Sequence, residues 1–227
     1  MHLRRPVEAP QIPPGMEICR VKYAHDGKNS TGASQAPYHV GMSDPAFQRM
    51  SVEEYLRTEP DSPVKREYVN GFVYPLHGQA GTSDAHDSIV GNIFFRLFPL
   101  ALAVGCRAYT SDMRVRSADG FSYFYPDTTV TCEPRQDDAR FKVAPCILVE
   151  VLSKSTAHND HNGKYHAYTA LPSLQTYLIV EQTERRVYVY QREGPRWTML
   201  EYAGSGQIPL PCLAAELSLD DIYDGVL

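Results

Sequence analysis

Residues 146–152 read Cys-Ile-Leu-Val-Glu-Val-Leu and are apolar at every position but one. A continuous apolar run of this length is typical of a β-strand that is covered on both faces. Burying the ionised carboxylate of Glu150 in such a strand costs on the order of several kcal/mol unless a cation pairs with it. We therefore predict that Glu150 belongs to a functional site and faces a metal ion or a Lys or Arg side chain. The alternative is that Glu150 lies at the exposed end of the strand and reaches water.

A second acidic residue interrupts another β-rich segment, residues 121–130. Asp127 follows Pro126 there, and because strand interiors disfavour both residue types, the pair predicts a bulge or a strand break. If the two strands are neighbours, Asp127 and Glu150 direct two carboxylates at one point, an arrangement that suits Mg²⁺ or Mn²⁺ together with water ligands. For Asp127 alone, an Asx turn is a serious alternative.

A polar helix predicted over 159–171 follows the Glu150 strand directly. Asp160, Lys164 and Tyr168 recur there every four residues and therefore share one face of the helix. Lys164 could lean back over the strand. The alternative, an exposed ion pair between Asp160 and Lys164, is equally compatible with this spacing.

Two short signals come earlier in the chain. Ser51 and Glu54 form a capping box, which predicts a helix that ends near Arg57. Asn70-Gly71 stands between two β-rich triplets, which predicts a β-hairpin over 66–74.

The remaining pattern predicts an α/β fold. Apolar residues at helical spacing predict a helix over 83–104, which Pro99 should kink or split. The sequence also predicts strands at 107–110, 113–116, 123–132, 146–152, 177–180, 187–190 and 197–202, and a helical turn within 217–223. Helix, sheet and helix in this order indicate a mixed central sheet flanked by helices.

The first 45 of the 227 residues differ from the rest. They hold six of the 17 prolines, and residues 25–34 are almost entirely turn formers and polar residues. We predict a flexible N-terminal extension over 1–45 and a single domain over 46–227.

Composition excludes several classes of protein. The longest apolar stretch, 93–104, is broken by Arg96 and Pro99 and is shorter than the roughly 20 residues that span a bilayer. No apolar stretch follows the basic residues near Met1, so no secretory signal is predicted. The net charge of −5 gives no support of its own for nucleic-acid binding.

Cysteine usage points to a reducing compartment. The five cysteines are odd in number and widely spaced, with no CxxC pair. They are Cys19, Cys106, Cys132, Cys146 and Cys212. This pattern argues against a disulfide framework and against a cysteine-rich zinc site, and it predicts a cytoplasmic protein.

The motifs together resemble the Uma-two family, a group of proposed restriction endonucleases in the PD-(D/E)XK nuclease superfamily. The resemblance covers about Ser51 to Tyr223 and rests on the order and spacing of five elements. These are the hairpin 67–74, His86, Tyr125-Pro126-Asp127, the segment 149–156, and Asp160 with Lys164 and Tyr168.

The resemblance implies a restriction-endonuclease-like core with a metal site at a strand break. It assigns Asp127 to the PD acid and Glu150 to the second acid, both as metal ligands, and Glu67 to the early acid. Leu152 occupies the usual lysine position, which implies that the catalytic lysine has moved to Lys164. The secondary candidates are His86, Asp160, Tyr168 and Lys154, which is a second candidate for the catalytic lysine.

The sequence therefore predicts a Mg²⁺-dependent (or Mn²⁺-dependent) endonuclease that hydrolyses DNA phosphodiester bonds, with DNA as partner, no membrane association and a possible homodimer. One alternative is a nuclease-fold module that binds DNA or regulates without useful turnover. Another is a metal-dependent phosphodiesterase acting on a small substrate, which would suit the negative net charge.

Overall fold

The computed structural model describes residues 48–76, 83–136, 139–152 and 163–227. The predicted extension over 1–45 lies outside the described residues. A six-stranded mixed sheet forms the larger layer, in the order β12-β11-β10-β9-β7-β4, and only β9 and β10 run parallel. Its strands are β4 (Arg107–Thr110), β7 (Thr128–Thr131), β9 (Pro145–Val151), β10 (Thr176–Val180), β11 (Arg186–Glu193) and β12 (Arg196–Ala203).

The strand that contains Glu150 is buried along its whole length, as its apolar run predicts. Alternate residues of β9 point to opposite faces of the sheet. Ile147, Val149 and Val151 join the core under α2 (Asp84–Ala103). Leu148 and Leu152 join a second core that includes Tyr168 of α4 (Tyr165–Thr169). Glu150 has the parity of Leu148 and Leu152, so the strand alternation directs it to the α4 side.

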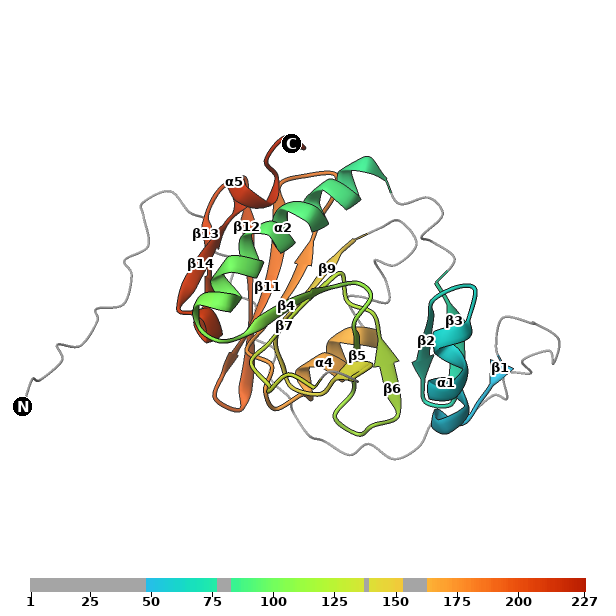
Figure 1. The fold of residues 1–227 in the computed structure, drawn as a ribbon. Coiled ribbons are helices and arrows are strands. Elements are labelled where there is room, and N and C mark those ends of the chain that lie inside the picture. Colours follow the sequence, from blue (N-terminus) through green and yellow to red (C-terminus); the bar gives the residue numbers. More distant parts are fainter. Residues whose placement is uncertain (1–47, 77–82, 137–138, 153–162) are drawn as a thin grey trace, which may run out of the picture.

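The C-terminal segment covers the same face of the sheet as α2 (Figure 1). It consists of β13 (Gln207–Leu210), η4 (Pro211–Leu213), β14 (Ala215–Ser218) and α5 (Leu219–Ile222). The helical turn predicted within 217–223 is confirmed by α5, whereas the β13–β14 hairpin was not predicted.

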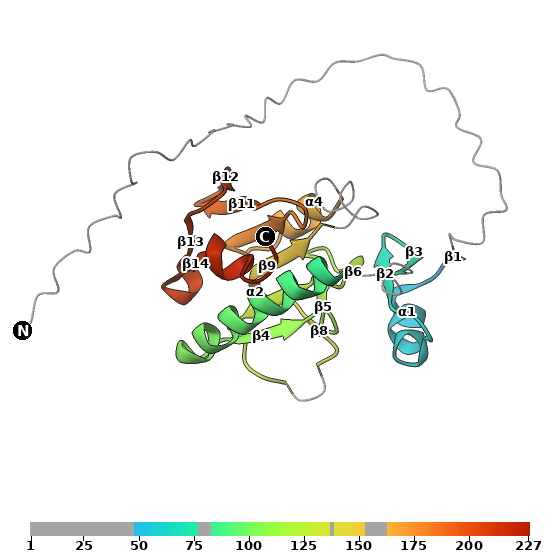
Figure 2. The same cartoon turned by 90° about the horizontal axis from the view of Figure 1, so that it is seen from above.

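A second six-stranded sheet has the order β1-β3-β2-β6-β5-β8. Its strands are β1 (Gln48–Arg49), β2 (Arg66–Val69), β3 (Phe72–Pro75), β5 (Arg114–Arg116), β6 (Ser122–Phe124) and β8 (Phe141–Lys142). Figures 1 and 2 place α1 (Val52–Thr58), the short helix η1 (Glu59–Asp61) and the β2–β3 hairpin together at one side of the molecule, next to β6.

The predicted hairpin turn is confirmed. Val69 pairs with Phe72, and Asn70 and Gly71 both have positive φ, 50° and 92°. A two-residue turn with both central residues in this region matches the right-handed twist of the strands. The capping box is confirmed as well, because Ser51 Oγ accepts a hydrogen bond from the Glu54 amide.

The predicted strand 123–132 is wrong in extent, although the break that Pro126 and Asp127 predict is present. The chain leaves the smaller sheet after β6 and enters the larger sheet at β7. Tyr125-Pro126-Asp127 is therefore the link between the two sheets.

Two other expectations need correction. The helix does not split at Pro99, because α2 continues through it. Pro99 leaves the Phe95 carbonyl without an amide partner, and Phe95 is 71% exposed, so water can hydrate that carbonyl. Four of the cysteines form the disulfides Cys106–Cys132 and Cys146–Cys212, because the fold brings together cysteines that are far apart in sequence.

Within the described part of the chain, no helix is long and apolar enough to cross a membrane.

Replacing Leu178 by Ala tests the assignment of the core. Leu178 is fully buried in β10 beneath α2, so we expect a loss of about 2–5 kcal/mol in the free energy of unfolding, measured by urea denaturation. The control is Leu102→Ala, since Leu102 lies on α2 but is 49% exposed, and we expect a change of about 0.5 kcal/mol or less. Equal losses in the two variants would contradict the assignment.

Candidate active site

Glu150 lies in the interior of the protein. Glu150 is 3% exposed, which excludes the alternative that its carboxylate reaches water at the end of the strand. Glu150 Oε1 accepts hydrogen bonds from Lys164 Nζ at 3.0 Å and from the Tyr168 hydroxyl at 2.8 Å. Both donors come from the segment that packs on the α4 side of β9, so the predicted cation partner of Glu150 is Lys164.

Lys164 joins a second acid to the cluster. Its Nζ lies 3.3 Å from Glu67 Oε1 on β2, and Lys164 and Glu67 are 7% and 9% exposed. The same Glu67 oxygen accepts a hydrogen bond from the Tyr125 amide at 3.2 Å. Glu67 therefore connects the lysine with the backbone of the Tyr125-Pro126-Asp127 link.

Tyr168 acts as a fixed hydrogen-bond donor. It is fully buried, with Phe124 and Tyr177 in edge contact with its ring. Burial, and then the negative charge of Glu150, raises the pKa of Tyr168 well above its ordinary value. The hydroxyl consequently keeps its proton and donates a hydrogen bond to Glu150.

Asp127 directly precedes β7, opposite the end of β9. Thr128 pairs with Val149 in the antiparallel register, so Asp127 and Glu150 occupy facing positions on neighbouring strands. Asp127 Oδ2 accepts a hydrogen bond of 2.7 Å from the Val151 amide. This contact crosses to the next strand, unlike an Asx turn, in which the side chain bonds to its own loop.

His86, in the first turn of α2, approaches Asp127 from the other side. Its Nε2 lies 3.6 Å from Asp127 Oδ2, and its side chain is 16% exposed. Burial lowers the pKa of His86, but the nearby acceptor and negative charge of Asp127 outweigh burial, so the net pKa is above the ordinary value. A proton on His86 is thus favoured by the acid that it faces.

Asp127 and Glu150 are the two residues whose carboxylates could bind a divalent metal ion. Among the described residues, no group of three His, Cys, Asp or Glu side chains is arranged to hold a metal. Asp127 and Glu150 supply carboxylates at facing positions, and Mg²⁺ commonly binds one or two carboxylates and keeps several waters. The residues therefore fit a site in which water completes the coordination. Two secondary candidates, Lys154 and Asp160, lie outside the described residues.

A buried acid that the sequence analysis did not identify supports this region. Glu59 in η1 is 6% exposed and accepts hydrogen bonds from the Arg66 amide, from Arg66 Nε and from the Tyr125 hydroxyl, at 2.9, 2.8 and 2.8 Å. Glu59 thus holds the side chain of Tyr125 while Glu67 holds its amide. No local pattern distinguishes Glu59 from an ordinary surface glutamate at a helix end.

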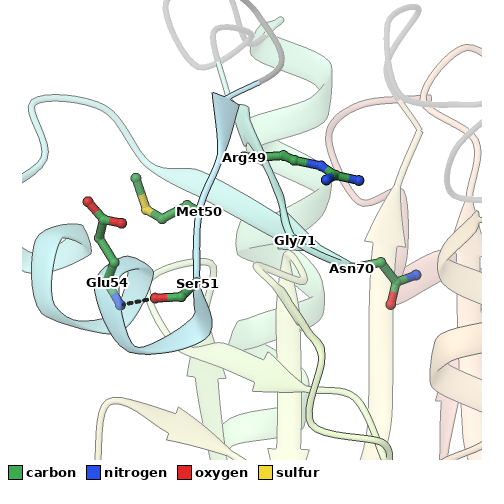
Figure 3. A pocket seen from close by; sticks show the side chains of 6 residues that line it. All are labelled: Arg49, Met50, Ser51, Glu54, Asn70 and Gly71. Carbon is green, nitrogen blue, oxygen red and sulfur yellow. Dashed lines mark hydrogen bonds between the residues drawn. The ribbon is translucent and has the colours of Figure 1, made fainter.

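A surface pocket of about 380 Å³ lies apart from these residues. The described residues that line it are Arg49, Met50, Ser51, Glu54, Asn70 and Gly71 (Figure 3). None of them is a candidate catalytic or metal-binding residue, so the pocket carries no part of the site.

The fold is that of a restriction-endonuclease-like α/β protein. It is similar to the crystal structure of a putative nuclease of the DUF820 group from Anabaena variabilis, with a TM-score of 0.63, 19% sequence identity, and coverage of 78% of this chain and 99% of that chain. At that identity the likeness concerns the fold alone.

The chain belongs to the Uma2 family, whose description is "Putative restriction endonuclease" and whose profile matches residues 52–221. Two proteins of Synechocystis are similar to it, both named as uncharacterized. The protein slr1290 is 33% identical over an alignment of 183 residues that covers 79% of this chain and 94% of that protein. The protein sll1609 is 38% identical over an alignment of 162 residues that covers 68% of this chain and 88% of that protein.

A double-mutant cycle on Lys164→Met and Glu150→Gln tests the buried ion pair. Lys164→Met leaves buried carboxylates without their cation, so we expect it alone to lower the free energy of unfolding by roughly 3–5 kcal/mol. The double variant should recover part of this loss, with a coupling energy of about 1–3 kcal/mol measured by urea denaturation.

The matched control is the same cycle on Lys65→Met and Asp112→Asn. That pair has a nitrogen–oxygen distance of 2.5 Å, but the Asp112 side chain is 82% exposed. Solvent screening limits such pairs to about 1 kcal/mol or less. Coupling at Lys164 no larger than at Lys65 would show that the buried pair does not stabilise the fold.

Proposed function

We propose that this protein is an endonuclease that hydrolyses DNA phosphodiester bonds with the help of Mg²⁺ or Mn²⁺. The observation that carries the proposal is the convergence of Glu150, Glu67 and Lys164 at one buried point, next to the strand position that faces Asp127. Family membership supports a nuclease, and we infer a DNA substrate from it. The activity would reside in a single domain over 46–227.

In this proposal Asp127 and Glu150 hold the divalent ion. When bound, such an ion lowers the pKa of a ligated water and neutralises charge on the scissile phosphate. The chain itself keeps the two acids in place, because Val151 donates its amide hydrogen to Asp127 and Tyr168 donates its hydroxyl hydrogen to Glu150. Both carboxylates are therefore oriented before any ligand arrives.

Lys164 is the catalytic lysine in this proposal. It lies within 3.3 Å of two carboxylate oxygens, which favour the charged ammonium form and suit it to stabilise negative charge on the phosphate. Glu67 holds it on the side of the β2 strand. This placement supports Lys164 over Lys154, the other candidate.

One observation favours a second candidate function, a nuclease-fold module that binds DNA without turnover. The ammonium group of Lys164 already pairs with both Glu150 and Glu67, so the buried Glu150 has a cation partner without a metal ion. Divalent-ion binding separates the two functions. Both of these proteins would bind DNA with an affinity that falls steeply as the salt concentration rises. A phosphodiesterase for small substrates would not.

Asp127→Asn and Glu150→Gln should each abolish cleavage of plasmid DNA in the presence of Mg²⁺, because each removes a charged metal ligand. Lys164→Ala should lower the single-turnover rate by about 100-fold, the usual scale for one lost charge-stabilising contact, and should change metal affinity little. A chelator should stop wild-type cleavage, and added Mg²⁺ should restore it.

The control is Asp112→Asn, which removes an exposed carboxylate and should cleave at the wild-type rate. Circular dichroism checks that every variant is folded. A wild-type rate for Asp127→Asn or Glu150→Gln would refute the metal-site assignment. If each chain has one site, cleavage of both DNA strands would favour a twofold homodimer. Light scattering tests this by measuring the mass of the active species.

A further inference from the structure

Four cysteines from four different segments of the chain meet at one end of the larger sheet. Cys106 precedes β4 and is bonded to Cys132, which follows β7. Cys146 lies in β9 and is bonded to Cys212 of η4. The sulfurs of Cys132 and Cys146 are 3.9 Å apart, so the two disulfides adjoin each other.

The two disulfides differ in access to solvent. Cys132 is exposed, whereas Cys106 and Cys146 are 3% and 5% exposed and Cys212 is half-buried. A reductant in solution therefore reaches the outer pair, Cys106–Cys132, through Cys132. The inner pair, Cys146–Cys212, contains no exposed residue, but the Cys132 sulfur lies 3.9 Å from Cys146 Sγ.

We infer that the four cysteines form one redox site, in which Cys132 exchanges disulfide bonds between the outer and the inner pair. The site is independent of the proposed nuclease activity, because none of its residues belongs to the candidate active site. Thiol and disulfide reagents would reach it through Cys132, the one exposed residue of the four.

The exchange proceeds in balanced steps. A dithiol reductant gives two electrons and two protons to the outer pair and is itself oxidised to a disulfide. The Cys132 thiolate then attacks Cys146 Sγ; the Cys132–Cys146 bond forms, the Cys146–Cys212 bond breaks, and Cys212 leaves as a thiolate that takes up a proton. Next, the Cys106 thiolate attacks Cys132 Sγ, which re-forms the outer pair and releases Cys146. The net result is that two electrons pass to the inner pair.

The separation between the two pairs supports this exchange. A distance of 3.9 Å between Cys132 Sγ and Cys146 Sγ is close to contact, so attack needs only a small side-chain rotation. The two residues also lie at one end of neighbouring strands, β7 and β9, whose register shifts between Val130 and Thr131. That irregularity lies directly before Cys132.

The decisive test compares two serine variants in a Cys19→Ser background, which removes the fifth thiol. Cys106→Ser leaves Cys132 without its partner, so we expect a Cys132–Cys146 disulfide and a free Cys212. Cys132→Ser is the matched control, because it breaks the same outer pair but removes the attacking sulfur. We expect it to retain Cys146–Cys212. Acid quenching, alkylation and peptide mass spectrometry identify the bonds in each protein.

Retention of Cys146–Cys212 with a free Cys132 in the Cys106→Ser protein would overturn the inference. A second measurement uses the protein with all four cysteines intact and one molar equivalent of dithiothreitol. We expect alkylation at Cys146 and Cys212 as well as at Cys106 and Cys132. Alkylation confined to Cys106 and Cys132 would exclude exchange between the two pairs. If all four cysteines remained free thiols after mild oxidation and bound a zinc ion, the site would be a metal site and the inference would be overturned.

Discussion

The contact between the Glu150 carboxylate and the Lys164 ammonium group is the constraint on which the arrangement of this protein depends. A carboxylate that is 3% exposed inside a fully buried strand is stable only with a cation and hydrogen-bond donors beside it. Lys164 and Tyr168 meet that need, and so the segment that leads into α4 must pack over β9. Lys164 also forms an ion pair with Glu67, and this contact places the β2–β3 hairpin next to β9 and α4.

The acids around this ion pair also fix the link between the two sheets. The chain passes from one sheet to the other through the link Tyr125-Pro126-Asp127. Each end of this link forms a hydrogen bond with another element. Glu67 accepts from the Tyr125 amide, and Asp127 accepts from the Val151 amide. A link with these contacts is rigid, which is what preorganised chemistry at the strand break requires. The residues proposed for catalysis therefore also stabilise the junction.

The cysteines add a second constraint at the opposite ends of the strands that bear the acids. On the chain, Asp127 and Cys132 flank β7, and Cys146 precedes Glu150 within β9. The pairs Cys106–Cys132 and Cys146–Cys212 close loops of 26 and 66 residues. Loops of this length restrict the unfolded chain considerably. The proposed redox site at one end and the candidate active site at the other end thus share the two strands β7 and β9.

Elements whose cause is local follow from short stretches of sequence. Asn70-Gly71 makes the hairpin turn, Ser51 caps α1, Pro126-Asp127 breaks the strand, and the apolar run around Glu150 makes a buried strand that needs a cation. Which groups meet depends on the packing of distant segments. The spacing of Lys164 was equally consistent with an exposed ion pair, Glu59 carried no local signal, and the widely spaced cysteines argued against disulfides. Each of these depends on contacts between segments far apart in the chain, which packing sets and local pattern does not encode.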